Sequence, residues 1–365
     1  LRTERSEVEA EVTLSTDPKK GLDAQVELKQ VDLGELKHVA QLPWGGVVSG
    51  TGTLKGAYGP EIRVEGRLSA KDLRFHALDI GQVETGLVFH RLKLEFPQAS
   101  VQKGRSRFAA EGWIDFGRKE PYARARATME GARVADLLQI IGDELWLFDH
   151  LRGRMDGRAS GEAVFVEGPM MRPTARINLN LDDATYFERK LGRGELSVRI
   201  DDGQTLDIDR LHFNGPSGRL SFTGGMRFDE ALDFVIDAPV LYVSELLKPD
   251  GVELNGSGTL SGKARLHGTP ERPLMDGEVD VDELKAYGLP FGSGRLTLRM
   301  DGKDLSLKGP LGHDLLLDMR MRNEGDLPFA IGATAHTRHL ERYLQGVEGV
   351  HGALQGDVLA TGTVM

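Results

Sequence analysis

Apolar and polar residues alternate with a period of two along most of this chain. Between residues 175 and 182, the odd positions hold Ala, Ile, Leu and Leu, and the even positions hold Arg, Asn, Asn and Asp. Such alternation gives a β-strand one apolar face and one hydrated face. About twenty segments follow this template, separated by turn signals such as Asp201-Asp202-Gly203 and Asn323-Glu324-Gly325. The sequence therefore predicts a mainly β protein of antiparallel hairpins and meanders.

Short helical segments interrupt the strands at regular distances. Each places one acidic residue among apolar neighbours, namely Glu35, Asp136, Glu245 and Glu341, and the distances between these residues are 101, 109 and 96 positions. This regularity indicates an internal repeat. Asp32 stands three residues before Glu35, which predicts a capping box at the start of the first helix.

A glycine-rich strand pair follows each short helix. The clearest copy runs from Gly256 through the Gly268-Thr269-Pro270 turn to residues 277–281, and the same order occurs earlier, at 50–70 and at 153–181. We therefore predict repeats at residues 1–130, 131–240, 241–336 and 337–365. The first and last copies are incomplete, so we expect the chain to be a segment of a longer protein.

This succession resembles the C-terminal repeats of AsmA-like and TamB-like envelope proteins. From the periodicity alone, the apolar faces are hidden either by packing two sheets together or by curling one sheet. The resemblance implies the second arrangement: an elongated, strongly curved antiparallel sheet that forms an open, taco-like groove with a few short helices. It also implies a non-enzymatic conduit for phospholipid across the periplasm of a diderm bacterium.

The apolar face is the predicted site. Soluble monomers rarely expose contiguous apolar patches above a few hundred Å², and burying each CH₂ of an acyl chain is worth about 0.8 kcal/mol, so lipid tails suit such a groove. The predicted lining residues all lie on the apolar side of their strands. They are Ile62, Val64, Leu68, Phe108, Ile114, Ile177, Leu179, Leu181, Leu196, Val198, Leu220, Phe222, Met226, Phe234, Ile236, Val279, Val281, Leu296, Leu298, Leu317, Met319, Phe329 and Ile331.

Partners and location follow from the resemblance. It implies inner- and outer-membrane components at the ends of the conduit and an anchor in the inner membrane, outside this segment. Its alternative implication is a scaffold for outer-membrane β-barrel assembly, which would act through exposed strand edges. A carbohydrate-binding sandwich or solenoid ranks lower, because the outward positions are mainly charged residues, Asn and Thr rather than aromatic residues.

Other chemistries find little support in the sequence. The net charge is -10 and the basic residues form no stripe, which argues against nucleic acid, and there is no Cys. His336, His339 and Glu341 are the best metal candidate, but their spacing fits no zinc pattern. The pairs Asp182-Asp183 and Asp201-Asp202 are interpreted as solvated turn residues. We predict no catalytic residue, no metal and no cofactor.

Two tryptophans follow the short helices. Trp44 and Trp146 come directly after the first and second of these segments. One interpretation is that each closes a local core where a helix packs over the edge of the groove. The other is that these segments line or narrow a lipid path.

Overall fold

The chain divides into two compact units, residues 1–182 with 199–204, and residues 183–198 with 205–365. Each unit is described by itself. The computed structural model describes residues 5–14, 21–35, 44–57, 61–75, 78–141, 150–165, 171–186, 189–227, 231–246, 256–286, 289–313, 315–322, 328–337 and 354–363.

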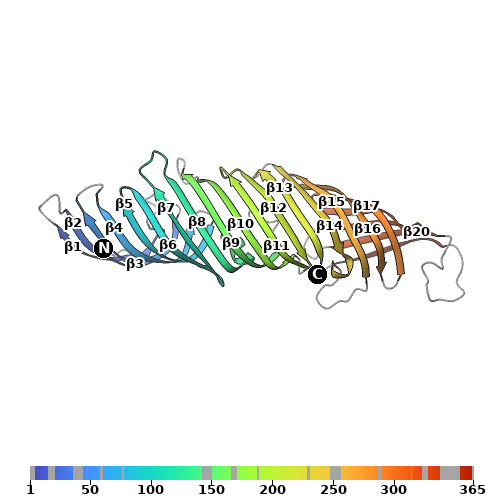
Figure 1. Cartoon of the computed structure of the whole chain (residues 1–365), viewed down its shortest axis with the longest axis horizontal. Helices are drawn as coiled ribbons and strands as arrows, with labels where there is room; N and C mark the ends of the chain where they lie inside the picture. Colours follow the sequence, from blue (N-terminus) through green and yellow to red (C-terminus); the bar gives the residue numbers. More distant parts are fainter. Residues whose placement is uncertain are drawn as a thin grey trace. The chain divides into compact units, whose positions relative to one another are not determined.

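The N-terminal unit is built from antiparallel strands that follow one another in chain order (Figure 1). Each strand pairs with the next. They are β1 (Glu7–Leu14), β2 (Leu22–Asp32), β3 (Trp44–Gly56), β4 (Arg63–Phe75), β5 (Leu78–His90), β6 (Lys93–Lys103), β7 (Ser106–Asp115), β8 (Tyr122–Arg133), β9 (Leu151–Phe165) and β10 (Met171–Tyr186).

The C-terminal unit repeats this meander. β11 (Arg189–Asp201) has residues in both units. It is followed by β12 (Thr205–Gly215), β13 (Gly218–Arg227), β14 (Ala231–Tyr242), β15 (Gly256–Gly268), β16 (Pro273–Ala286), β17 (Leu289–Asp301), β18 (Asp304–Leu311), β19 (Leu315–Arg322), β20 (Pro328–Thr337) and β21 (Leu354–Thr363). The described strands of each unit belong to one sheet. The mainly β, antiparallel prediction is confirmed, and within each unit the two-sheet sandwich is excluded.

Two short helices are described, α2 (Val134–Ile141) after β8 and α3 (Val243–Leu246) after β14. Both stand where the sequence predicts them. Of the first predicted helix, residues Leu33 to Glu35 form a turn, and the fourth, around Glu341, lies outside the described residues.

The strands bend at bulges, and these bulges recur. The ladders shift register at Ala70/Leu73 in β4 and at Val281/Leu284 in β16. Asp72, Asp183 and Glu283 take positive φ values of 51°, 52° and 48°, in β4, β10 and β16. Since the same rare conformation and the same helix position both return after six strands, the fold repeats with a six-strand period. The repeat boundaries in residue numbers stay a prediction.

Each unit forms its core from one face of its own sheet. In the C-terminal unit Val281, Leu296 and Leu311 are buried together, and the half-buried leucines that pack on them include Leu260 and Leu317. These residues come from β15 to β19. A sheet whose strands bend at bulges covers its own apolar face in this way.

Candidate functional site

The register places the predicted lining residues of the N-terminal unit on one face. Val64 pairs with Phe89 and Phe108 with Met129. Ile114 pairs with Ala123 on the same ladder as Phe108. Ile114 and Phe108 are an even number of residues apart on β7, so their side chains lie on the same face. Ile62, Leu68, Ile177, Leu179 and Leu181 occupy the same side by this alternation. We name this side the apolar face of the unit.

The C-terminal unit has an apolar face of the same design. Phe222 pairs with Leu211 and with Ile236, and its ring stacks on Phe234 with 4.8 Å between centroids. Val279 pairs with Leu296. The backbone register repeats this pattern in the remaining ladders. Its Cα pairs are Leu220 with Phe213, Met226 with Leu206, Leu298 with Leu307, Leu317 with Ala333, Met319 with Ile331, and Phe329 with Met321. Leu196 and Val198 alternate in step with Gly194, which lies against the Phe213 ring.

Exposure divides the lining residues into two groups, apart from Phe329 and Ile331, whose side chains lie outside the described part of the chain. Seven are buried with 1% to 7% of their surface exposed: Phe108, Leu179, Leu181, Val198, Phe234, Val281 and Leu296. The half-buried group is Ile62, Val64, Leu68, Ile114, Ile177, Leu196, Leu220, Phe222, Met226, Ile236, Val279, Leu298, Leu317 and Met319. The half-buried group keeps part of its apolar surface exposed, whereas the buried group belongs to the core.

Small residues line the apolar face on β8 and β9. Ala125 pairs with Gly161 and Ala127 with Ala159. These side chains extend no further than one methyl group from the backbone, so the apolar side chains of β8 and β9 are short along this stretch. The larger side chains of Phe108 and Leu179 flank this stretch on β7 and β10.

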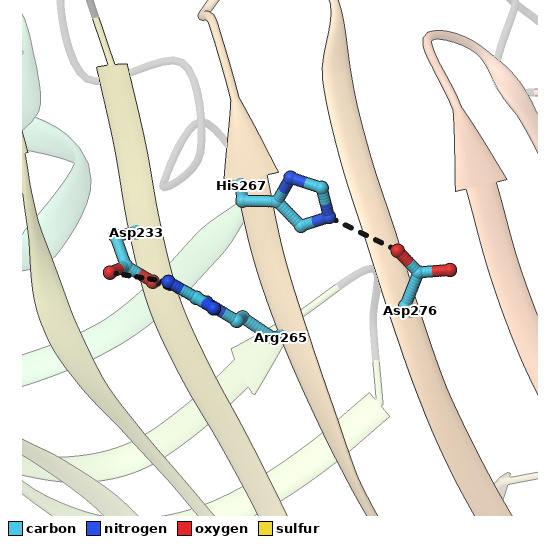
Figure 2. Close-up of polar contacts among 4 residues, drawn as sticks. All are labelled: Asp233, Arg265, His267 and Asp276. Atoms are coloured by element: carbon cyan, nitrogen blue, oxygen red, sulfur yellow. Dashed lines mark hydrogen bonds and ion pairs between the residues drawn. The ribbon is translucent and has the colours of Figure 1, made fainter.

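The opposite face of each sheet is polar and crossed by ion pairs. On β14 to β16, Arg265 donates to both oxygens of Asp233, at 2.8 and 3.0 Å, and His267 Nε2 lies 3.1 Å from an Asp276 oxygen (Figure 2). The hydrogen bond from Arg265 lowers the pKa of Asp233 and raises that of Arg265. All four side chains are at least a third exposed. Each pair therefore contributes little to the stability of the fold, and the charged groups chiefly keep this face hydrated.

A hollow of about 1630 Å³ lies over β3 to β10 of the N-terminal unit. Its charged walls come from the polar face. Glu65, Glu84 and Glu111 lie on β4, β5 and β7, and the arginines are Arg67 on β4 and Arg126, Arg158 and Arg176 on β8 to β10. Of the predicted apolar lining, it contains only Leu68. Two further described hollows, one over β1 to β4 and one over β16 to β19, also have mostly charged and polar side chains at their walls. Sequence reasoning gave no role to this face.

A serine hydroxyl bonds both to a backbone N–H and to an acidic side chain at the start of α2 and at the corresponding turn of the first copy, Leu33 to Glu35. In the second copy, Ser106 Oγ accepts from the Arg133 N–H at 2.7 Å and donates to Asp136 Oδ2 at 2.6 Å. In the first copy, Ser6 Oγ accepts from the Asp32 N–H at 3.0 Å and donates to Glu35. The Ser6 hydroxyl thus links the Asp32 N–H to Glu35, the two residues of the predicted capping box.

The third copy keeps a serine at the same position, but its hydroxyl does not bridge a backbone N–H and an acidic side chain among the described residues. Ser217 precedes β13 as Ser6 precedes β1, and Ser106 begins β7. Here the Tyr242 N–H donates to the Ser217 carbonyl at 3.0 Å. The Ser217 hydroxyl is buried and has no hydrogen-bond partner within the described part of the chain.

Trp44 packs against the opposing strand. Its ring lies 4.4 Å from that of Phe75, centroid to centroid, and the two residues pair across β3 and β4. Phe75 is buried, so Trp44 packs on a local core. The helix of the first interpretation is not found at Leu33 to Glu35, which form a turn, and residues 36–43 lie outside the described part of the chain. Trp146 lies outside the described residues.

The remaining candidates bring no reactive groups together. Asp202 lies in the turn after β11, is 57% exposed and faces Arg172. Asp183 occupies the bulge of β10. His339 and Glu341 of the metal candidate lie outside the described residues, as does the His336 side chain. Among the residues that are described, no group of three metal-ligating side chains is found.

The described helices include none with the length and apolar character needed to cross a bilayer. Comparison with known proteins adds no relative: no family model, no curated protein and no solved structure matches this chain.

Proposed function

We propose that this chain is a non-enzymatic conduit that holds the acyl chains of phospholipid against the apolar face of its sheet. The observation that carries the proposal is the pairing of apolar side chains along that face, strand after strand, in both units. An acyl chain is apolar along its length, so it matches a continuous surface rather than a pocket.

The size of the gain supports lipid tails. A sixteen-carbon tail that left water completely would gain on the order of 12 kcal/mol before entropic costs, at about 0.8 kcal/mol per CH₂. The stretch of short side chains at Ala125 and Ala127 on β8 offers space for a chain between the larger flanking residues. Phospholipid head groups would stay in water, because the face has no charged residue among the paired positions of β7 and β8 that point to it.

The setting follows the resemblance to AsmA-like and TamB-like proteins. The chain would then lie in the periplasm and carry phospholipid between the inner and outer membranes. Components of the two membranes would bind the ends of the conduit. The described part of this chain contributes the groove lining and no chemistry.

Lipid carried through purification tests the proposal. The purified protein is extracted with organic solvent, and the phospholipid per mole of protein is measured by mass spectrometry. Ala125→Asp places a carboxylate on the apolar face of β8, whereas Arg124→Asp places one on the polar face of the same strand. We expect the first variant to lose lipid and the second to retain it, with circular dichroism confirming that both are folded. Absence of phospholipid from the folded unsubstituted protein would overturn the conduit and favour the scaffold alternative.

A further inference from the structure

Three arginines gather at one end of the hollow on the polar face of the N-terminal unit. Arg126 of β8 pairs with Ser160 of β9, and Arg158 of β9 pairs with Thr128 of β8. Gly157 lies against Leu179 and Gly161 against Ala175, which sets Ser160 opposite Arg176 of β10. All three guanidinium groups therefore rise from adjacent strands about 4.8 Å apart.

These arginines make fewer and longer ion pairs than Arg265 and Arg295 on the polar face of the C-terminal unit. Within the described part of the chain, Arg158 and Arg176 contact no carboxylate, and Arg126 reaches Glu111 only at 4.0 Å. In the C-terminal unit, by contrast, Arg265 and Arg295 each make two hydrogen bonds to one aspartate. Like charges on neighbouring strands repel each other. This repulsion raises the free energy of the empty cluster, and a bound anion would relieve it.

The groups around the cluster suit a phosphate. Guanidinium presents planar, paired N–H donors that match two oxygens of a phosphate. The hydroxyls of Ser160 and Thr128 stand beside the arginines and line the same hollow. Several donors thus point into a space of about 1630 Å³ that is open to water.

We propose that Arg126, Arg158 and Arg176 form a binding site for a compact anion that carries more than one phosphate group. Guanidinium groups on adjacent strands are spaced to hold separate phosphates of one molecule. The site lies in a hollow, which a flat membrane surface does not enter. The chain has a net charge of -10, so attraction of anions arises locally at this cluster and not from the protein as a whole.

The site is independent of lipid on the apolar face, because it occupies the other side of the sheet. Inorganic tripolyphosphate is the probe, titrated calorimetrically into the whole chain at low ionic strength. The test variant is Arg158→Gln with Arg176→Gln. The matched control is Arg74→Gln with Arg107→Gln, two exposed arginines of the same unit that do not line the hollow. Both pairs change the net charge by the same amount.

We expect the dissociation constant to rise by about tenfold or more in the test variant, as two charge-assisted contacts are lost, and to change little in the control. Binding should also weaken as salt is raised. The proposal is overturned if the unsubstituted protein does not bind tripolyphosphate, or if the two variants weaken binding equally. Sedimentation with phosphatidylglycerol vesicles distinguishes a free polyphosphate from the phosphates of lipid head groups. If the protein binds vesicles more tightly than tripolyphosphate, and the test variant abolishes vesicle binding, the cluster is a membrane-surface site instead.

Discussion

Ser106 Oγ lies 2.6 Å from Asp136 Oδ2 and accepts the Arg133 N–H at 2.7 Å, so one hydroxyl from β7 closes the first turn of α2. Both Ser106 and Asp136 are buried. The turn before β7 fits closely around the carboxylate, since a methyl group on Gly104 would lie 2.4 Å from Asp136 Oδ1. This contact joins β7 to the helix that follows β8 and fixes where α2 begins.

Ser106→Ala should lower the free energy of unfolding by about 1–3 kcal/mol. It leaves the part-buried Arg133 N–H without its acceptor and removes one donor from the buried Asp136 carboxylate, which keeps the Arg105 N–H at 3.1 Å. Urea denaturation measures the change. Ser217→Ala is the matched control, since the Ser217 hydroxyl is buried without a partner among the described residues, and its loss should be neutral or stabilising. If both variants lost the same free energy of unfolding, the hydrogen bonds of Ser106 would not explain the effect.

Phe234→Ala should cost about 3–5 kcal/mol of unfolding free energy, as expected for a large side chain removed from a core. Phe234 is 1% exposed and stacks on Phe222. Val235→Ala, next to it and 44% exposed on the polar face, should change stability far less. A similar cost for both variants would mean that the apolar face of β14 does not form a core.

Acid should remove the contribution of the Asp233–Arg265 pair. The hydrogen bond from Arg265 holds the pKa of Asp233 below its ordinary value of 3.8. The stabilisation is therefore complete above that ordinary value and is lost as the pH falls through the lower folded pKa. Unfolding measured from pH 6 to pH 2 should show Asp233→Asn less stable than the unsubstituted protein at the upper end, with the difference vanishing at the lower end.

Arg265→Gln serves as the partner control for this pH dependence. Arg265 supplies the largest of the effects that lower the pKa of Asp233, and the charge of His267 supplies a smaller one. The pH-dependent difference should therefore shrink strongly when Asp233→Asn is made in the Arg265→Gln background. A difference that stays the same size in that background would assign the effect to another group.

Much of the fold was predictable because apolar and polar residues alternate in the sequence wherever one face of a strand is apolar and the other polar. Ile177 and Arg176 illustrate this: their alternation predicted the sides on which the register places them. The short helices were also readable, since α2 and α3 begin at the predicted Val134 and Val243.

What the sequence analysis missed depends on distant contacts. Ser106 stands 30 residues before Asp136, and a lone serine at a strand start carries no local signal of helix capping. Its recurrence was the available clue, because Ser6, Ser106 and Ser217 each precede their acidic residue by a similar distance. The arginine cluster was missed for the same reason: Arg126, Arg158 and Arg176 meet only through strand register, which the pattern does not specify.

Capture of lipid by a photo-reactive amino acid tests the central claim most directly. The probe is placed at Ile177 in the N-terminal unit and at Phe222 in the C-terminal unit, both half-buried on the apolar face. Matched probes at Asn180 and Thr223, exposed on the polar face of the same strands and outside the arginine cluster, report non-specific contact. Our account predicts phospholipid cross-links at Ile177 and Phe222 and none above background at Asn180 and Thr223. Equal labelling on both faces, or none on either, would contradict it.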